Sequence, residues 1–337
     1  MSLHDPGQMS SIRLGTVLVS GAYGFLGRRV LAVLANRPGI VQLLAGSRRS
    51  APSDTGLLDL VTPFELDITS TVRVPPGVQT VIHIAGEKRD VARMQAVNEE
   101  GARRLAVASA QSGVTRFVHV SSVGVYGAPP DSGVIDERYL HAPTNVYEQT
   151  KDAGERRVRE VCAEAGVECV VVRPSNVIGL VPGGGYPLRG LVHAIARGQF
   201  VWFGPQRRAW LNYVHVDDTA MAIVAAAERA PAGSEYNVNC PVPLADAVTW
   251  IADELTVPYP RRHLPRWLGR AAGELGSFVS NATGRGLPFD RARFQELTSN
   301  MMFDAAKLPR ETGFVYEIGA ESMFRALAGA YGLGITR

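Results

Sequence analysis

A glycine-rich segment near the N-terminus limits the fold of this 337-residue chain more than any other feature of the sequence. It reads S-G-A-Y-G-F-L-G and carries Gly21, Gly24 and Gly27. The β-branched run Thr16–Ser20 comes directly before it, and Phe25–Ala35 has the composition of a helix. Glycines between a strand and a helix permit a tight turn and let backbone N–H groups approach a pyrophosphate at the helix N-terminus. The segment therefore predicts a strand, a nucleotide-binding turn and a helix; a turn with a structural role alone is the alternative.

Short apolar runs alternate with longer helical segments through the first half of the chain. Further strands are predicted at Val41–Ala45, Thr80–Ile84, Arg116–Val120 and Cys169–Arg173. Helices are predicted at Ala92–Ser112 and Val146–Glu164. The strand runs lack strict apolar–polar alternation, as expected for strands covered on both faces. We therefore predict the α/β class, with a Rossmann-type doubly wound parallel sheet and a smaller, mainly helical C-terminal substrate lobe.

The domain boundaries are expected where this alternation stops. It weakens after residue 179, and the region that follows has mostly helical signals broken by prolines. A strand-like run in that region indicates that the second lobe is not one contiguous piece. We expect a disordered leader at 1–12, a nucleotide-binding domain at 13–180 to which 208–240 returns, and a substrate-binding lobe at 181–207 and 241–337.

The composition argues against several classes of partner. The 35 basic residues are balanced by 32 acidic ones and form no long run, so a nucleic-acid partner is not expected. No apolar stretch approaches the ~20 residues that span a bilayer, and the N-terminus lacks the apolar centre of a signal peptide. The chain has three cysteines without metal-ligand spacing, namely Cys162, Cys169 and Cys240. We expect a cytoplasmic protein with a small-molecule substrate and no metal, nucleic-acid or membrane partner.

Tyr147 and Lys151 are the most informative pair of side chains. Residues four apart lie on the same side of a helix, so the Lys151 ammonium can sit beside the Tyr147 phenol and favour its ionised form. A tyrosine titrates near ~10 and needs such help to transfer a proton at neutral pH. The sequence has ten tyrosines but only three lysines, so this spacing is uncommon by chance. A pair on the surface of an amphipathic helix is the alternative.

The choice between NAD and NADP should be written at the end of the second strand. An acidic side chain about 20 residues past the glycine turn binds the ribose 2′-hydroxyl of NAD, whereas an arginine accommodates the 2′-phosphate of NADP. Residues 45–47 read Ala-Gly-Ser, and Arg48 and Arg49 follow. This pattern favours NADP; NAD remains the alternative if the two arginines are merely solvated.

Further motifs follow in an order that is typical of one group of enzymes. They are Asp67-Ile68, His83-Ile84-Ala85-Gly86, Asn98, Ser121-Ser122, Arg173-Pro174-Ser175-Asn176, Tyr213-Val214-His215-Val216-Asp217-Asp218 and Phe303-Asp304-x-x-Lys307. Together with the glycine turn and the tyrosine–lysine pair, they resemble the extended short-chain dehydrogenase/reductase superfamily, the NAD(P)-dependent epimerase/dehydratase family. The resemblance covers nearly the whole chain and implies an enzyme with a nicotinamide cofactor.

The resemblance also implies roles for individual residues. Tyr147 would exchange a proton with a substrate hydroxyl or carbonyl, Lys151 would lower the tyrosine pKa and hold the nicotinamide ribose, and Ser122 would hydrogen-bond the reacting oxygen. The implied cofactor-binding residues are Gly21, Tyr23, Gly24, Phe25, Leu26, Gly27, Arg48, Arg49, Asp67, Ile68, Ala85, Gly86, Lys151, Pro174 and Asn176.

Three functions remain open on the sequence. One is the oxidation or reduction of a secondary hydroxyl or ketone carbon; another is a sugar-nucleotide epimerase or dehydratase with a recycled cofactor. Epimerases of this group often carry a diphosphate-binding arginine at the position that Leu211 occupies here. The third is a non-catalytic NADP-sensing protein, against which the retained tyrosine and lysine argue. A homodimer through the helices around 92–112 and 146–164 is implied by the resemblance alone.

Overall fold

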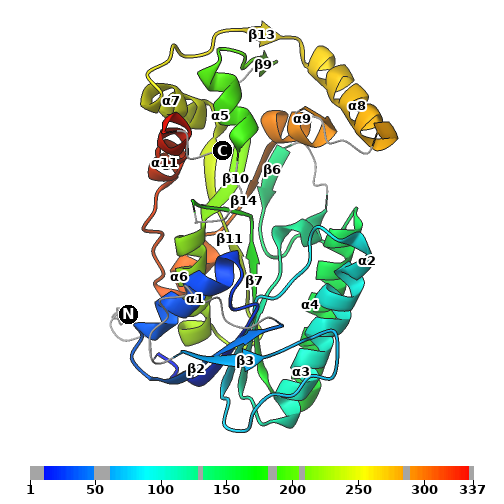
Figure 1. Cartoon of the computed structure of the whole chain (residues 1–337), viewed down its shortest axis with the longest axis vertical. Helices are drawn as coiled ribbons and strands as arrows, with labels where there is room; N and C mark the ends of the chain where they lie inside the picture. Colours follow the sequence, from blue (N-terminus) through cyan, green and yellow to red (C-terminus); the bar gives the residue numbers. More distant parts are fainter. Residues whose placement is uncertain are drawn as a thin grey trace, which may run out of the picture.

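In the computed structural model, which describes residues 11–48, 61–127, 132–180, 188–204, 209–283 and 289–333, a parallel sheet of seven strands forms the larger lobe (Figure 1). The strands lie in the order β3-β2-β1-β4-β5-β7-β11, and every neighbouring pair runs parallel. They are β1 (Gly15–Ser20), β2 (Ile40–Ser47), β3 (Val61–Glu65), β4 (Thr80–His83), β5 (Arg116–Val120), β7 (Glu168–Pro174) and β11 (Glu235–Val238). The strand order reverses between β1 and β4, where doubly wound sheets bind their ligands. The predicted α/β class and Rossmann-type sheet are confirmed.

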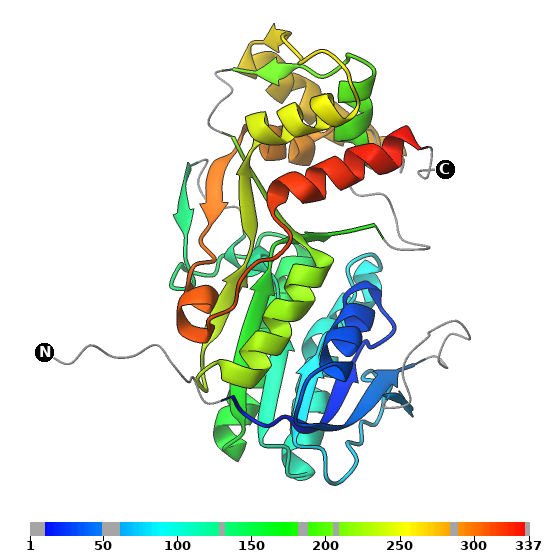
Figure 2. The same ribbon diagram turned by 90° about the vertical axis from the view of Figure 1, so that its left-hand side faces the viewer.

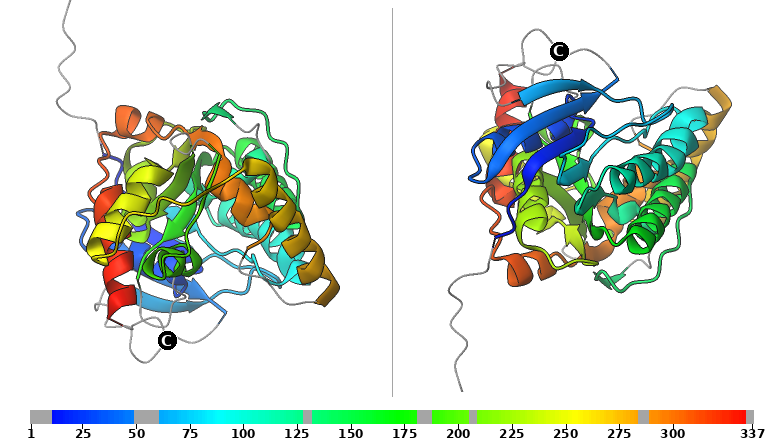
Figure 3. Two further views of the ribbon diagram at one scale, coloured as in Figure 1. Left: turned by 90° about the horizontal axis from the view of Figure 1, so that it is seen from above. Right: turned by 90° about the horizontal axis from the view of Figure 1, so that it is seen from below.

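Helices cover both faces of this sheet (Figure 3). One face carries α1 (Phe25–Ala35) and α6 (Val216–Arg229); the other carries α3 (Ala102–Gln111) and α4 (Val146–Ala165). Side chains of β1 alternate between two cores: Val17 and Val19 pack under α1 and α6, and Leu18 packs under α3 and α4. Burial on both faces explains why the strand runs are continuously apolar.

A helical segment with a π-helix at its centre connects β4 to β5. It consists of α2 (Val91–Met94), the π-helix η1 (Gln95–Gly101) and α3. The sequence predicts a helix here but gives no sign of the π-turn. Gly154 of α4 crosses η1 so closely that a Cβ atom there would lie 2.0 Å from the carbonyl oxygen of Asn98. Only glycine fits at that crossing, and the contact fixes α4 against η1.

A smaller lobe covers the carboxyl ends of the large sheet (Figure 2). A three-stranded sheet joins β8 (Asn176–Ile178), β10 (Trp210–His215) and β12 (Cys240–Pro243), while β9 (Trp202–Phe203) pairs with β13 (His263–Leu264) and β6 (Ser132–Ile135) with β14 (Asn300–Phe303). The remaining helices are η2 (Val123–Tyr126), α5 (Arg189–Ala196), α7 (Leu244–Glu254), α8 (Arg266–Thr283), α9 (Arg291–Thr298), α10 (Lys307–Thr312) and α11 (Ala320–Gly332). The lobe has a core of its own that includes Trp202, Leu211 and Phe324.

One segment of the chain passes between the two lobes, and another lies at the N-terminal end of the described residues. Residues 209–240 contribute β10 to the small sheet and α6 and β11 to the larger lobe. Residues 1–10 of the expected leader lie outside the described residues, and the Ile12 N–H donates to the Glu228 carbonyl oxygen at 2.7 Å. Within the described part of the chain, every helix is too short or too polar to cross a bilayer.

Candidate functional site

A cavity of about 1650 Å³ lies between the two lobes and brings most of the predicted site residues together. The predicted residues that line it are Gly21, Tyr23, Gly24, Phe25, Leu26, Gly27, Arg48, Ile68, Ala85, Gly86, Ser122, Tyr147, Lys151, Pro174 and Asn176. Asp67 lies beside the cavity without lining it, and Arg49 falls outside the described residues. The cavity opens where the strand order reverses, as the doubly wound fold predicts.

The glycine turn is packed so tightly that a side chain would clash with the backbone at two of its glycines. Gly21 has a φ of +68°, and a Cβ atom on it would lie 2.8 Å from the backbone nitrogen of Ala85. A Cβ atom on Gly27 would lie 2.2 Å from the Gly21 carbonyl oxygen. Helix α1 begins at Phe25, and its N-cap residue, Gly24, has no side chain that could cap the first N–H groups. The first N–H groups of α1 therefore have no side-chain cap, and Gly24, Phe25 and Leu26 line the cavity, which suits a bound pyrophosphate.

Ser20 holds the turn after β4 against the glycine turn. Its Oγ accepts hydrogen bonds from the backbone nitrogens of Ile84 at 3.1 Å and Ala85 at 3.3 Å. The Ser20 hydroxyl proton is therefore directed to Nδ1 of His83, 2.6 Å away. This arrangement places Ala85 next to Gly21 at the floor of the cavity.

The end of β2 forms the part of the cavity expected to meet the adenosine ribose. Gly46 and Ser47 complete the strand, and the exposed Arg48 follows at the cavity edge. Nearby, one Asp67 carboxylate oxygen accepts hydrogen bonds from the Thr69 backbone at 2.9 Å and from its hydroxyl at 2.7 Å. These bonds lower the pKa of Asp67. Asp67 is thus occupied in shaping its own loop, whereas Arg48 lines the cavity.

Ser122 and Tyr147 meet at the start of α4. The helix is capped by Asn145, whose side chain accepts from the Glu148 backbone nitrogen at 3.0 Å, so its first turn is fixed. Burial raises the pKa of Tyr147, and a hydrogen bond with the Ser122 hydroxyl opposes this shift. The phenol is therefore held in its protonated form. A lowering of its pKa by Lys151 stays a prediction.

Lys151 lies one turn further along α4 and is buried. Its Nζ donates to the Val120 carbonyl oxygen at 2.7 Å, at the end of β5. Burial lowers the pKa of Lys151 to about 8, and the charge of Glu155 opposes this shift. An ammonium has three protons, so two remain for other acceptors in the cavity.

Asn98 connects the loop after β4 to α4. Its Oδ1 accepts from the Glu87 backbone nitrogen at 2.8 Å, and its Nδ2 donates to the Glu87 carbonyl at 2.8 Å and to the Thr150 hydroxyl at 3.1 Å. The loop from Gly86 to Lys88, which lines the cavity, is thereby fixed relative to α4.

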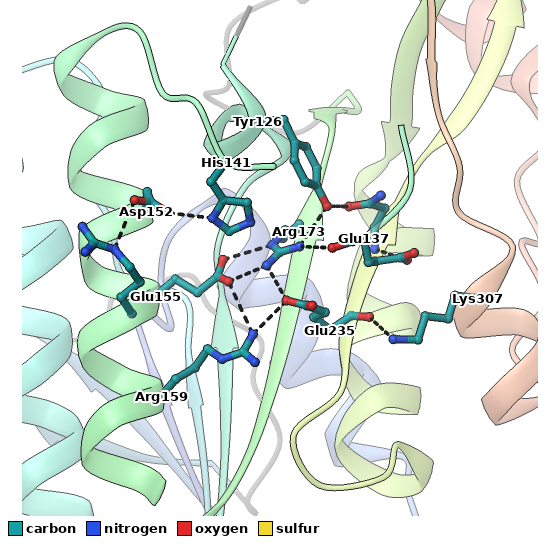
Figure 4. A network of polar contacts seen from close by, with 11 residues as sticks. Tyr126, Glu137, His141, Asp152, Glu155, Arg159, Arg173, Glu235 and Lys307 are labelled. Atoms are coloured by element: carbon teal, nitrogen blue, oxygen red, sulfur yellow. Dashed lines mark hydrogen bonds and ion pairs between the residues drawn. The ribbon is translucent and has the colours of Figure 1, made fainter. Parts of the chain in front are cut away.

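A network of ion pairs and hydrogen bonds around the buried Arg173 and Glu155 connects α4 to the large sheet (Figure 4). Arg173 of β7 forms a bidentate pair with Glu155 of α4, at 3.0 and 2.5 Å, and also contacts Glu235 at 2.5 Å. It donates to the Tyr126 phenol at 2.8 Å. Burial would raise the pKa of Glu155, but the hydrogen bonds and charge of Arg173 outweigh it and lower that pKa. The network joins α4, β7 and β11, and its Glu155 lies one turn after Lys151 on α4.

The smaller lobe adds residues that the sequence pattern did not single out as a set. Trp210, Tyr213 and Met301 line the cavity beside Arg293 and Glu296 of α9. Arg293 donates to Glu296 at 2.6 Å, and the Tyr213 phenol bonds to the same carboxylate. These side chains come from two stretches far apart in the chain, 210–213 and 293–301, and no local spacing signals their meeting.

Comparisons with known proteins agree with this geometry. The model of the NAD dependent epimerase/dehydratase family matches residues 17–239. The UDP-glucose 4-epimerase of Vibrio cholerae is 25% identical over 283 residues, covering 80% of this chain and 85% of its own length. The 4-hydroxy-2-methyl-3-oxo-4-farnesyl-3,4-dihydroquinoline-1-oxide ketoreductase of Stigmatella aurantiaca is 26% identical over 272 residues, covering 78% and 80%.

Solved structures share the fold. RMD from Pseudomonas aeruginosa, determined with NADPH, superposes with a TM-score of 0.64 at 21% identity and covers 94% of this chain and 98% of its own. The family model, by contrast, matches well over half of the chain by sequence. With its glycine turn, its tyrosine–lysine pair and the cavity that contains both, the chain belongs to the NAD-dependent epimerase/dehydratase family of extended short-chain dehydrogenases/reductases and is an enzyme that uses a nicotinamide cofactor.

Proposed function

We propose that this enzyme transfers a hydride between NADP(H) and a carbon that carries a secondary hydroxyl or a ketone, with Tyr147 as the general acid or base. The observation that carries the proposal is the meeting of Ser122, Tyr147 and Lys151 in the cavity that also contains the glycine turn. Two hydroxyls and an ammonium suit an oxygen whose charge changes during the reaction. The relative named as a ketoreductase supports this reaction class.

Tyr147 moves the proton that accompanies the hydride. In reduction its phenol donates that proton to the carbonyl oxygen, while the Ser122 hydroxyl donates a hydrogen bond to the same oxygen. Burial favours the protonated phenol, which suits this direction. In oxidation the Tyr147 oxygen accepts the hydroxyl proton, and the Lys151 ammonium stabilises the phenolate. The nicotinamide, when bound, supplies or accepts the hydride.

The cavity residues fit the parts of a dinucleotide. The N–H groups at the start of α1 suit the pyrophosphate, and the two protons of Lys151 not directed to Val120 suit the hydroxyls of the nicotinamide ribose. Arg48 suits a 2′-phosphate, which favours NADP over NAD. For the adenine we propose Asp67 and Ile68, and for the floor and the nicotinamide Ala85, Gly86, Pro174 and Asn176.

Sugar-nucleotide epimerisation or dehydration with a recycled cofactor is the second candidate. The relative named as a UDP-glucose 4-epimerase favours it. Two observations weigh against it. Leu211, at the position of the expected diphosphate-binding arginine, belongs to the core of the smaller lobe. Arg293, a cation that lines the cavity, already pairs with Glu296.

The test is an assay of the parent enzyme and Tyr147→Phe with NADPH, NADH, ketones and UDP- or dTDP-sugars. We expect NADPH consumption with a ketone that falls at least ~100-fold in Tyr147→Phe while NADPH binding is retained. Tyr331→Phe, which removes a phenol bonded to His193 outside the cavity, is the matched control. Conversion of a sugar nucleotide without net loss of cofactor would favour the second candidate. Binding of NADPH without turnover in every variant would indicate a non-catalytic NADP sensor.

Two further properties belong to this proposal. We propose a homodimer that forms through α3 and α4, whose sides away from the sheet carry exposed charged residues such as Arg157 and Glu160. Light scattering of the purified protein tests it, and a monomeric mass at micromolar concentration would contradict it. We also propose a cytoplasmic location, where the NADPH pool is available.

A further inference from the structure

Helix α8 turns a row of large apolar side chains toward solvent. Trp267, Leu275 and Phe278 have 68%, 64% and 71% of their surface exposed. They are spaced by eight and three residues, which puts them on one side of an α-helix together with the exposed Ala271 between them. Figure 1 and the left view of Figure 3 show α8 at the outer edge of the smaller lobe, on the side away from α7 and α11.

The opposite side of α8 is fixed against α9 by glycines. A Cβ atom on Gly269 would lie 2.4 Å from the ring of Phe203, and one on Gly276 would lie 2.2 Å from the Phe289 carbonyl oxygen. The helix therefore docks through a side that only glycine permits. Its rotation is set by this contact, and the apolar row faces outward as a consequence.

Positive charge is concentrated at the N-terminal end of this apolar row. Residues 261–279 contain four arginines, Arg261, Arg262, Arg266 and Arg270, against one acidic residue, Glu274. All four arginines are exposed. Glu274 is itself paired with Arg291 at 3.6 Å. An exposed apolar row with tryptophan and phenylalanine, bordered by arginines, is the composition of helices that lie in a membrane interface.

We propose that α8 binds the surface of an anionic phospholipid bilayer, with Trp267, Leu275 and Phe278 inserted among the lipids and the arginines on the headgroups. Such a contact needs no spanning helix. It replaces the expectation, drawn from the sequence, that the protein has no membrane partner. The arginines favour an anionic surface over a second copy of this chain, whose own α8 segment carries the same net positive charge. The face continues into the cavity wall, since α8 packs on α9, which carries Arg293 and Glu296.

The test is flotation of the full-length protein with vesicles of phosphatidylcholine alone and with equal parts of phosphatidylglycerol. We expect binding to the anionic vesicles that falls at least about tenfold in the triple variant Trp267→Gln/Leu275→Gln/Phe278→Gln. The control is Leu140→Gln/Val315→Gln/Leu333→Gln, which removes three similarly exposed but scattered apolar side chains and should bind as the parent does. Melting temperature and mass, measured without lipid, should agree among the three proteins.

Tryptophan fluorescence gives a second readout that does not depend on folding differences. Trp267 is the most exposed of the four tryptophans. Brominated lipids should quench its emission in the parent, whereas Trp267→Phe should still float with the vesicles and lose the quenching. The proposal is overturned if the parent does not bind anionic vesicles, or if the triple variant binds as well as the parent. A dimer that the triple variant converts to a monomer, without vesicle binding by the parent, would also overturn it and identify the face as a contact between copies.

Discussion

At the scale of single residues, the steric demands of the nucleotide turn can be tested directly. Gly27→Ala would place a Cβ atom 2.2 Å from the Gly21 carbonyl oxygen, and the backbone must shift to relieve the clash. We expect a loss of about 1–3 kcal/mol in the free energy of unfolding and weaker NADPH binding. Chemical denaturation and cofactor titration measure both quantities. The control is Gly190→Ala on α5, where a Cβ atom meets open space and stability should change by less than about 1 kcal/mol. Equal effects of the two variants would contradict the steric explanation.

Lys151 predicts a pH limit on reduction. Its pKa of about 8 means that the ammonium is present below that pH and is lost as the pH rises through it. If the ammonium supports ribose binding and the oxygen charge of Tyr147, kcat/KM for reduction should be level below about pH 8 and should fall about tenfold per unit above it. Lys151→Arg keeps a positive charge at all these pH values, so its residual activity should lack this limb. A limb that persists unchanged in Lys151→Arg would assign it to another group.

Some residues of the site could be predicted from spacing within one segment of the sequence, whereas others are brought together only by the fold. Tyr147 and Lys151 could be found because their four-residue spacing is a property of one helix. Arg48 could be found because it follows one strand at a fixed distance from the glycine turn. The bond of Tyr213 to Glu296 joins β10 to α9 through two residues that are 83 positions apart, and no spacing within either segment predicts it. The hydrogen bonds of Asp67 to Thr69 are local, two residues apart, and shape the loop where the adenine is proposed to bind.

At the scale of secondary-structure elements, the ion pair of Glu155 and Arg173 fastens α4, which carries Tyr147 and Lys151, to the sheet. The two side chains are 2% and 1% exposed, so loss of the Glu155 charge would leave the buried Arg173 with one carboxylate, Glu235, in place of two. The charge of Glu155 also raises the pKa of Lys151, one turn away on α4. Fold stability and the proton affinity of Lys151 are therefore coupled through one carboxylate.

Glu155→Gln should show both effects. We expect a loss of about 3–5 kcal/mol in the free energy of unfolding and a displacement of the pH limb of reduction to lower pH. Replacing both partners, as Glu155→Met/Arg173→Met, should recover most of the stability because no unpaired charge remains. Glu160→Gln, an exposed acid of the same helix that pairs with Arg157, should cost less than about 1 kcal/mol. A pH limb that does not move in Glu155→Gln would contradict the coupling.

The elements that sequence predicted well are those with local start signals. Helices α1 and α4 begin at Phe25 and Val146, as predicted, and five strands of the large sheet, β1, β2, β4, β5 and β7, lie within a few residues of their predicted runs. The pairing of β6 with β14 was not predicted, because two strands of four residues lie over 160 residues apart. The π-helix η1 lies where Gly154 of α4 crosses it, and this tertiary contact has no local signal in the sequence.

At the scale of the whole molecule, two histidines buried at the centre of the large sheet make the stability of the fold depend on pH. His83 and His119 lie side by side on β4 and β5, with ring centroids 5.3 Å apart. Burial lowers the pKa of His83 to about 3 and that of His119 well below its usual value, and the charge of Lys151 lowers both further. Both ring nitrogens of His119 are buried without a hydrogen-bond partner among the described residues. The folded protein therefore keeps both imidazoles neutral in mildly acidic solution.

His119→Leu should make the protein less sensitive to acid. In the unfolded chain a histidine binds a proton near pH 6.5, whereas His83 and His119 stay neutral when folded, so the unfolded state binds more protons as the pH falls. Each histidine should thus reduce the free energy of unfolding by up to about 1.4 kcal/mol per pH unit between about 6.5 and its own folded pKa. His119→Leu should halve this slope and leave stability at pH 7 within about 1 kcal/mol of the parent, because it also removes an unsatisfied polar group. Phe117→Leu, a buried change on the same strand, should lower stability by a similar amount at every pH; an unchanged slope in His119→Leu would show that other groups govern acid unfolding.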